Sequence, residues 1–219
     1  MRWSGRLTVR CSSCSRPVRP VVALDIDGTL GDYHGHFKWF AERYLGRPMP
    51  AEDYDYTAPF GEWLGLDKRT YREIKLAYRQ GGMKRWMPAH AGVDDLSHRA
   101  RAAGCEVWIA TTRPYMRLDN IDPDTRHWLE RNGMRYDAIT YGEDKYHDMI
   151  EKVESERIIA VIDDLPEQIE RALELGIASY LASNGHAEKV RKWYRTVEGT
   201  EQMARIIEEG AYQWNQLQQ

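Results

Sequence analysis

The sequence has few cysteines and no long hydrophobic stretch. None of its apolar segments approaches the roughly 18 consecutive apolar residues that a membrane-spanning helix needs, so we expect no membrane association. Three cysteines cannot form a disulfide framework. The formal net charge of −3 argues against a protein that coats nucleic acid without sequence preference, because such binding needs excess positive charge. With 42% hydrophobic and 30% charged residues, the chain is expected to be soluble and globular.

The N-terminal segment differs from the rest in composition. Residues 1–19 contain five arginines, four serines and no acidic residue. We interpret residues 1–20 as a disordered basic arm, or as residues upstream of the native start, and we expect a cytoplasmic location. A mitochondrial transit peptide is the alternative, but a clear amphipathic apolar face is missing. Cys11 and Cys14 form only half of a zinc-binding pattern, so a redox pair or an incidental match is favoured over a structural metal.

From Val21 onward, short apolar segments alternate with helical patterns, which is typical of a parallel α/β sheet. Asp122 is expected to cap a helix that begins at Pro123 and ends at Gly133, and Pro166 is expected to begin another. The pattern predicts an α/β fold with a Rossmann-like, doubly wound parallel sheet. The expected strands are 21–26, 107–110, 136–139, 158–162 and 177–181, with further helices at about 92–103 and from about 201.

The segment 31–90 separates the first two expected strands. It is longer than a crossover between neighbouring parallel strands requires. It is rich in aromatic residues and contains helix-compatible stretches such as 37–45 and 70–78. We therefore interpret 31–90 as an inserted helical cap that selects the substrate, and 21–30 together with 91–219 as the catalytic core.

Acidic and hydroxyl side chains follow the expected strands at their ends. The first strand ends in Asp25 and Asp27, the second in Thr111, and the fourth in Asp163 and Asp164. Ligands of open parallel sheets bind beyond the carboxyl ends of the strands, so these side chains are expected to meet at one edge. Crowded carboxylates repel one another unless a cation lies among them, and all-oxygen ligands suit a hard ion. The sequence therefore predicts a Mg²⁺ site.

These residues resemble the motifs of the haloacid dehalogenase superfamily over nearly all of 21–183. The DxDGT motif is present from Asp25 to Thr29, and Thr111 matches the threonine that ends the second strand. Lys145 matches the lysine ahead of the fourth strand, and the pair Asp163–Asp164 matches the final acidic motif. Lys152 and Lys189 are other candidates for the lysine, and Lys145 is preferred because it begins the last helix before the fourth strand.

The resemblance implies an aspartyl-phosphate mechanism. Asp25 is expected to attack phosphorus, and Asp27 to act as general acid and base. Mg²⁺ is expected to be bound by Asp25, the Asp27 backbone carbonyl, and one or both of Asp163 and Asp164. The remaining predicted phosphate-binding groups are the Thr111 hydroxyl, the Thr112 backbone amide, Arg113 and Lys145.

The substrate is expected to be a small phosphorylated molecule. The segment after the first motif and the stretch from Trp86 to Val93 resemble the 5′(3′)-deoxyribonucleotidase family, which implies nucleoside (deoxy)monophosphates. Aromatic rings suit base stacking, and Tyr54, Tyr56, Trp63 and Trp86 are the predicted pocket residues. His34 and His36 are expected to be hinge residues rather than metal ligands.

Other functions stay open on this sequence. The Thr-x-Arg turn and the Asp–Asp pair also resemble the phosphatase half of polynucleotide kinase, which makes a polynucleotide 3′-end phosphatase the first alternative. A phosphatase for a non-nucleotide metabolite is the second, and a non-enzymatic binding module is disfavoured because every catalytic position is present.

Overall fold

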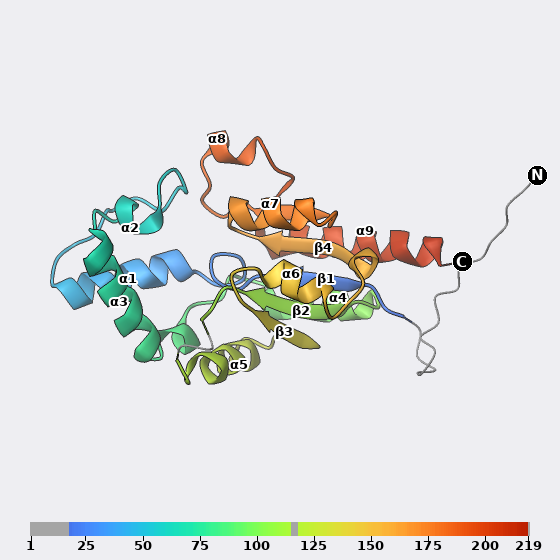
Figure 1. The fold of residues 1–219 in the computed structure, drawn as a ribbon, viewed down its shortest axis with the longest axis horizontal. Helices are drawn as coiled ribbons and strands as arrows, with labels where there is room; N and C mark the ends of the chain where they lie inside the picture. The colour runs from blue at the N-terminus through green and yellow to red at the C-terminus, as the bar shows by residue number, and fades with distance from the viewer. Residues whose placement is uncertain (1–17, 115–117, 219) are drawn as a thin grey trace, which may run out of the picture.

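The computed structural model describes residues 18–114 and 118–218 (Figure 1). Its six strands form one parallel sheet in the order β3-β2-β1-β4-β5-β6. The predicted α/β class and parallel sheet are confirmed, and the edge strand β6, only two residues long, is an addition to the five expected strands. The strands are β1 (Val21–Leu24), β2 (Glu106–Thr111), β3 (Ala138–Tyr141), β4 (Ile158–Asp163), β5 (Ser179–Ala182) and β6 (Thr196–Val197).

Two strands begin two residues later than the sequence predicted. Asp137 lies at the entrance to β3, where its carboxylate accepts a hydrogen bond from the Val107 amide at 2.9 Å and pairs with Arg101. Ile177 precedes β5 and packs in the core beneath the sheet. Both residues therefore belong to the turns that lead into the strands.

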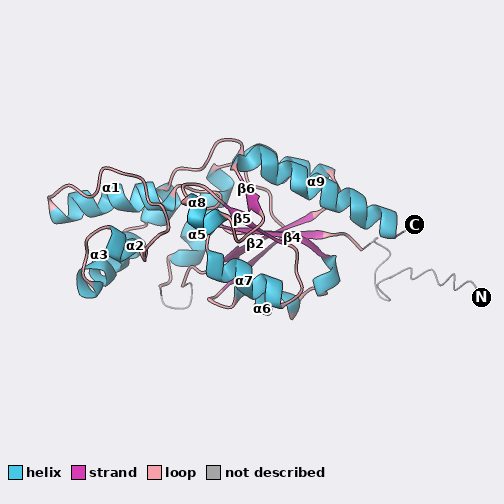
Figure 2. Cartoon of the chain, turned by 90° about the horizontal axis from the view of Figure 1, so that it is seen from above, coloured by secondary structure: helices cyan, strands magenta, loops and turns pink. Residues whose placement is uncertain are grey.

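Helices cover both faces of the sheet. Val22 and Leu24 of β1 pack on one face with α4 and α9, while Val21 and Ala23 pack on the other with α6 and α7. This follows from the two-residue period of a strand, and Figure 2 shows α9 on one side of the sheet with α6 and α7 on the other. The helices of this part are α4 (Val93–Ala102), α5 (Ile121–Arg131), α6 (Lys145–Ile150), η2 (Ser155–Arg157), α7 (Pro166–Glu174), α8 (Glu188–Arg191) and α9 (Gly199–Leu217).

One helix begins at the residue that the sequence predicted, and another does not. Pro166 is the first residue of α7, as predicted, because its missing amide hydrogen is not needed there. α5 begins at Ile121, two residues before the predicted start, so the expected cap at Asp122 is wrong. The Asp122 carboxylate accepts hydrogen bonds from Arg126 and Tyr141 instead.

The segment 31–90, called the cap segment below, contains α1 (Tyr33–Leu45), α2 (Phe60–Trp63), α3 (Lys68–Gln80) and the 3₁₀-helix η1 (Met83–Trp86). α1, α2 and α3 lie beyond one end of the sheet (Figure 1). The segment leaves and re-enters side by side: the Asp32 amide donates to the Pro88 carbonyl, and the His90 amide to the Leu30 carbonyl, both at 2.9 Å. One hydrophobic cluster continues from the sheet into these helices. This double crossing positions the cap segment over the ends of the strands.

Most of the predicted basic arm, including Cys11 and Cys14, lies outside the described residues. Its last residues are described and run alongside β2: the Pro20 carbonyl accepts a hydrogen bond from the Glu106 amide at 2.8 Å, and Arg19 pairs with Glu106 and Asp137 at 3.5 Å. The part of the chain that the structure describes has no helix both long and apolar enough to span a membrane.

Candidate active site

Three carboxylates meet at the carboxyl ends of β1 and β4. Asp25 follows β1, Asp163 ends β4 and Asp164 is the next residue. The two strands are hydrogen-bonded neighbours in the sheet, so their ends are adjacent. All three side chains are buried, and each offers an oxygen within 4.8 Å of the others. We call Asp25, Asp163 and Asp164 the acid cluster.

Lys145 is the cation that contacts this cluster. It is the first residue of α6, and its fully buried Nζ lies 2.6 Å from both Asp25 Oδ1 and Asp163 Oδ2. Burial would lower the pKa of Lys145, but the two carboxylates outweigh it and raise the pKa above its ordinary value. The alternatives Lys152 and Lys189 are exposed. The structure therefore brings Lys145, and neither alternative, to the acids.

Asp164 is held by a residue of the cap segment and by a neighbouring loop. Tyr56 donates its hydroxyl hydrogen to Asp164 Oδ2 at 2.8 Å, and His186 Nε2 lies 2.7 Å from the Asp164 backbone oxygen. Gly28 adopts a φ of +99°, and a Cβ at this position would lie 2.1 Å from Asp164 Oδ2. Glycine is therefore required at position 28, because any side chain there would collide with Asp164.

The acid cluster carries more negative charge than Lys145 can compensate. Burial, with the neighbouring carboxylates, raises the pKa of Asp164 well above its ordinary value and that of Asp25 to about 7, although Lys145 opposes the second shift. Full ionisation of all three carboxylates in this buried all-oxygen site therefore needs a cation in addition to Lys145. Mg²⁺ requires this kind of ligand, so the residues present fit the predicted ion.

Metal binding should therefore be visible in thermal stability. We expect saturating Mg²⁺ to raise the melting temperature by about 5–10 °C at a hundredfold excess over Kd, relative to NaCl of equal ionic strength. Asp164→Asn should lose most of this shift, because one ligand charge is removed. Asp53→Asn, an exposed position outside the cluster, is the matched control. An equal Mg²⁺ shift in both variants would contradict the metal site.

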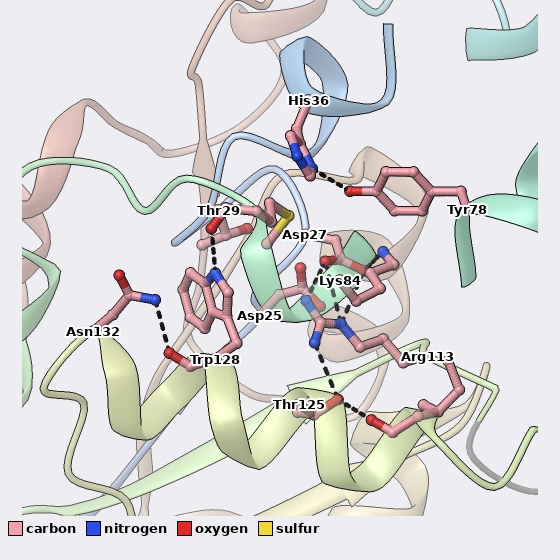
Figure 3. A network of polar contacts seen from close by, with 12 residues as sticks. Asp25, Asp27, Thr29, His36, Tyr78, Lys84, Arg113, Thr125, Trp128 and Asn132 are labelled. Carbon is pink, nitrogen blue, oxygen red and sulfur yellow. Dashed lines mark hydrogen bonds and ion pairs between the residues drawn. The ribbon is translucent and has the colours of Figure 1, made fainter. Parts of the chain in front are cut away.

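Asp27 points to a different set of partners, shown in Figure 3. Arg113 contacts Asp27 Oδ1 with Nη2 at 2.7 Å, and Lys84 forms a second, short ion pair with Oδ2. Arg113 is oriented by Thr125, whose hydroxyl oxygen accepts from Nη1 at 3.0 Å. Burial would raise the pKa of Asp27, but Arg113 and Lys84 outweigh it and hold this pKa well below its ordinary value. Asp27 is therefore ionised here.

This arrangement corrects the expected role of Arg113. The sequence predicted a phosphate contact because Arg113 follows Thr112 at the end of β2. The side chain is 1% exposed and its guanidinium is committed to Asp27 and Thr125. Arg113 therefore positions Asp27 instead of facing the substrate.

Lys84 was not anticipated. It lies in η1 of the cap segment, is buried, and has its Nζ 4.0 Å from the centroid of the Tyr33 ring. Burial lowers the pKa of Lys84 to about 7, although Asp27 opposes the shift. The sequence around Lys84 gives no signal that this side chain is buried, because lysine is almost always solvated.

A cleft of about 880 Å³ opens from the acid cluster toward the cap segment. Asp25, Asp27 and Thr112 border its floor. Tyr54 and Tyr56, two of the predicted pocket residues, also border it. Further aromatic or basic lining residues are Tyr33, His34, Phe60, Lys68, Tyr71, Lys75, Arg79 and Lys84. The hydroxyl oxygen of Thr111 is buried and has no hydrogen-bond partner in the described part of the chain.

The structure does not bring the two predicted tryptophans to this cleft. Trp86 is 52% exposed and packs against His127 and Arg131 on the outside. Trp63 packs against Phe60 with ring centroids 6.1 Å apart and is not among the residues that line the cleft. The expected role of Trp86 in the pocket is therefore wrong, because its side of η1 faces away from the acids.

Tyr56 connects the cap segment to the core. Its ring stacks on His186 with centroids 3.5 Å apart, and its φ of 60° is unusual for a residue with a side chain. His34 Nδ1 lies 3.2 Å from the Tyr56 hydroxyl, and the Ala187 amide donates to the Asp55 carbonyl at 3.1 Å. The two histidines predicted as hinge residues lie in different surroundings. His34 borders the cleft, while His36 Nδ1 lies 2.7 Å from the Tyr78 hydroxyl oxygen (Figure 3).

The chain resembles known proteins in its fold and not in its sequence. No family model and no curated protein matches this sequence. Among solved structures, a predicted phosphatase from Clostridium acetobutylicum superimposes with a TM-score of 0.62 at 15% identity, covering 88% of this chain and 100% of that one. The chain has the haloacid dehalogenase fold.

Two further structures agree. A HAD family hydrolase from Deinococcus radiodurans, solved with bound phosphate and sodium, has a TM-score of 0.60 at 14% identity and covers 88% of this chain and 96% of that one. A haloacid dehalogenase-like protein from Streptococcus pneumoniae has a TM-score of 0.54 at 16% identity, with 82% and 92% covered. The acid cluster lies at the carboxyl edge of the sheet, which is where open parallel sheets bind ligands.

Proposed function

We propose that this protein is a Mg²⁺-dependent phosphomonoester hydrolase that acts through an aspartyl-phosphate on Asp25. The observation that carries the proposal is the buried acid cluster, contacted by Lys145, of which Asp25 and Asp164 line an 880 Å³ cleft. The solved structures with a similar fold include a predicted phosphatase. The direct test is Mg²⁺-dependent release of phosphate from a panel of monoesters.

In the first half-reaction, the Asp25 carboxylate attacks phosphorus. A bond forms between a carboxylate oxygen and phosphorus, the ester bond breaks, and the leaving oxygen takes a proton from Asp27. Lys145 and the Thr111 hydroxyl, with the Thr112 amide, stabilise the negative charge on the transferring phosphoryl group. The acid cluster and the Asp27 backbone carbonyl would hold Mg²⁺, which would supply further positive charge to this transfer.

In the second half-reaction, water attacks phosphorus and releases phosphate from Asp25. Asp27 accepts the proton of this water, and the ionised form that Arg113 and Lys84 favour is the form that can do so. Asp27 must carry a proton in the first half-reaction in order to protonate the leaving group. It therefore has to lose part of its contact with Lys84 during turnover. Lys84 belongs to the cap segment, and movement of that segment would alter this contact.

The favoured substrates are nucleoside (deoxy)monophosphates. Tyr54, Phe60 and Tyr71 border the cleft and provide apolar surfaces on which a base can stack. Tyr56 is already stacked on His186 and bonded to Asp164, so it is less suited to this role. A polynucleotide 3′-end phosphatase is the alternative that the positively charged side chains of the cleft favour.

Base stacking can be tested with Tyr54→Leu. Stacking contributes roughly 1–3 kcal/mol per base, so the variant should lose about one to two orders of magnitude in kcat/KM toward deoxynucleoside monophosphates. Activity toward p-nitrophenyl phosphate should change little. Trp86→Leu is the matched control, because this ring lies outside the cleft. Equal proportional losses on both substrates in folded Tyr54→Leu would contradict nucleotide stacking, and turnover of a 3′-phosphorylated oligonucleotide alone would favour the alternative.

A further inference from the structure

One face of α3 directs two cations toward the cleft. Tyr71, Lys75 and Arg79 follow one another at intervals of four residues, so their side chains lie along one stripe of the helix. All three border the cleft that contains Asp25 and Thr112, and each is partly buried. The stripe thus extends along the wall of the site.

These two cations have no ion-pair partner among the residues that the structure describes. Within residues 18–114 and 118–218, neither Lys75 nor Arg79 forms an ion pair, and Arg79 Nε is buried without a hydrogen-bond partner. The Lys75 ammonium lies over the Tyr71 ring, 5.3 Å from its centroid. Buried polar atoms in folded proteins are nearly always paired, so the unpartnered Arg79 Nε, with the Lys75 ammonium one turn away on the same wall, calls for a ligand.

Outside the acid cluster, the acidic residues that line the cleft either have other partners or are exposed. Asp27 is bound by Lys84 and Arg113, and Asp67 accepts hydrogen bonds from the first turn of α3. Glu62 and Glu167 are exposed and pair with neither cation. Burial, together with the charge of Arg79, lowers the pKa of Lys75 to about 8, although the more distant charges of Asp27 and Glu143 oppose this shift.

We propose that Lys75 and Arg79 form a subsite for a second anionic group of the substrate, distinct from the phosphate that Asp25 attacks. This inference rests on the proposed phosphatase function and extends the favoured substrates from nucleoside monophosphates to esters whose leaving group carries a second phosphate or a carboxylate. Lys84 is excluded from the subsite because Asp27 already binds it, and Lys68 because it is exposed. Guanidinium and ammonium groups bind both kinds of anion through charge-assisted hydrogen bonds.

Matched pairs of esters test the subsite in the wild-type protein. Deoxyadenosine 5′-monophosphate is compared with deoxyadenosine 3′,5′-bisphosphate, and glycerol 3-phosphate with 3-phosphoglycerate. The member with the second anionic group should, in at least one pair, have a kcat/KM about 10- to 100-fold higher, as expected for a hydrogen bond to a charged group. The first pair reports a second phosphate and the second pair a carboxylate, so the preferred pair identifies the anion.

Variants assign the preference to the stripe. Lys75→Gln and Arg79→Gln should each remove most of the preference by raising KM for the ester with the second anionic group, with kcat/KM for its partner changed by less than about threefold. Arg72→Gln, an exposed arginine on the same helix, should retain the preference. Equal losses on both members of a pair, or a preference that survives both variants, would overturn the subsite.

The inference and the proposed function fail in different ways. If the wild-type protein hydrolyses both members of each pair with equal efficiency, the subsite is wrong and the phosphatase assignment stands. If it hydrolyses none of the esters with Mg²⁺, the phosphatase assignment is wrong. Calorimetric titrations of deoxyadenosine 3′,5′-bisphosphate and of 3-phosphoglycerate into wild-type protein and Lys75→Gln, all without Mg²⁺, then still test the subsite: unchanged affinity of both compounds in the variant would refute it.

Discussion

Asp25→Asn is expected to abolish phosphatase activity while leaving the fold intact. An amide is not an anionic nucleophile, and removing the nucleophile of a covalent mechanism reduces turnover by about four orders of magnitude or more. The variant should fold, because Asp25 is one of three crowded, buried carboxylates and Lys145 keeps its second contact at 2.6 Å with Asp163. The loss should appear in kcat with Mg²⁺ at saturation.

A matched control and a covalent readout make this prediction specific. Asp32→Asn is the same substitution seven residues along the chain, and asparagine can replace aspartate as the cap of α1. This control should retain activity. In wild-type protein, acid quenching during turnover followed by peptide mass spectrometry should find phosphate on the peptide that contains Asp25. Hydrolysis near the wild-type rate in Asp25→Asn would eliminate the aspartyl-phosphate mechanism.

The convergence of the acids was predictable from the sequence because it depends on local rules. Asp25, Asp163 and Asp164 each follow a buried apolar strand, and parallel strands end at the same edge of a sheet. Lys145 was selected by its position at the start of the last helix before β4, and the structure brings it to the same acids. Strand periodicity and sheet topology suffice for the three acids, whereas Lys145 also needed the resemblance to a family motif.

The contacts made across the cap segment were not predictable. Whether Lys84 reaches Asp27, and whether Tyr54 or Trp86 faces the cleft, depends on how α1, α3 and η1 pack on one another. An aromatic-rich composition identifies a hydrophobic core without indicating which ring lines a pocket. Arg113 was misassigned for the same reason: its position beside Thr112 was right, but the carboxylate that binds it lies in another loop. Strand β6 has only two residues and no periodicity to detect.

Asp27→Asn should lower kcat by roughly 10²–10⁴-fold with little change in KM, because general acid–base catalysis contributes about that much. The structure adds a second expectation. The substitution leaves Lys84 and Arg113 buried without the carboxylate that both contact, so the free energy of unfolding should also fall. Kinetics therefore have to be measured at a temperature where thermal melts and circular dichroism show the variant to be folded.

Lys84→Met separates the chemical role of Asp27 from the integrity of its ion pairs. This variant removes one partner of Asp27 but keeps the carboxylate and its contact with Arg113, 2.7 Å from Oδ1. Its loss in kcat should be about tenfold or less, since proton transfer by Asp27, worth roughly 10²–10⁴-fold, is retained. If Lys84→Met instead loses as much turnover as Asp27→Asn in folded protein, the effect comes from the disrupted ion pairs. Asp27 would then be a positioning residue, and the acid–base role would belong to another group of the cleft.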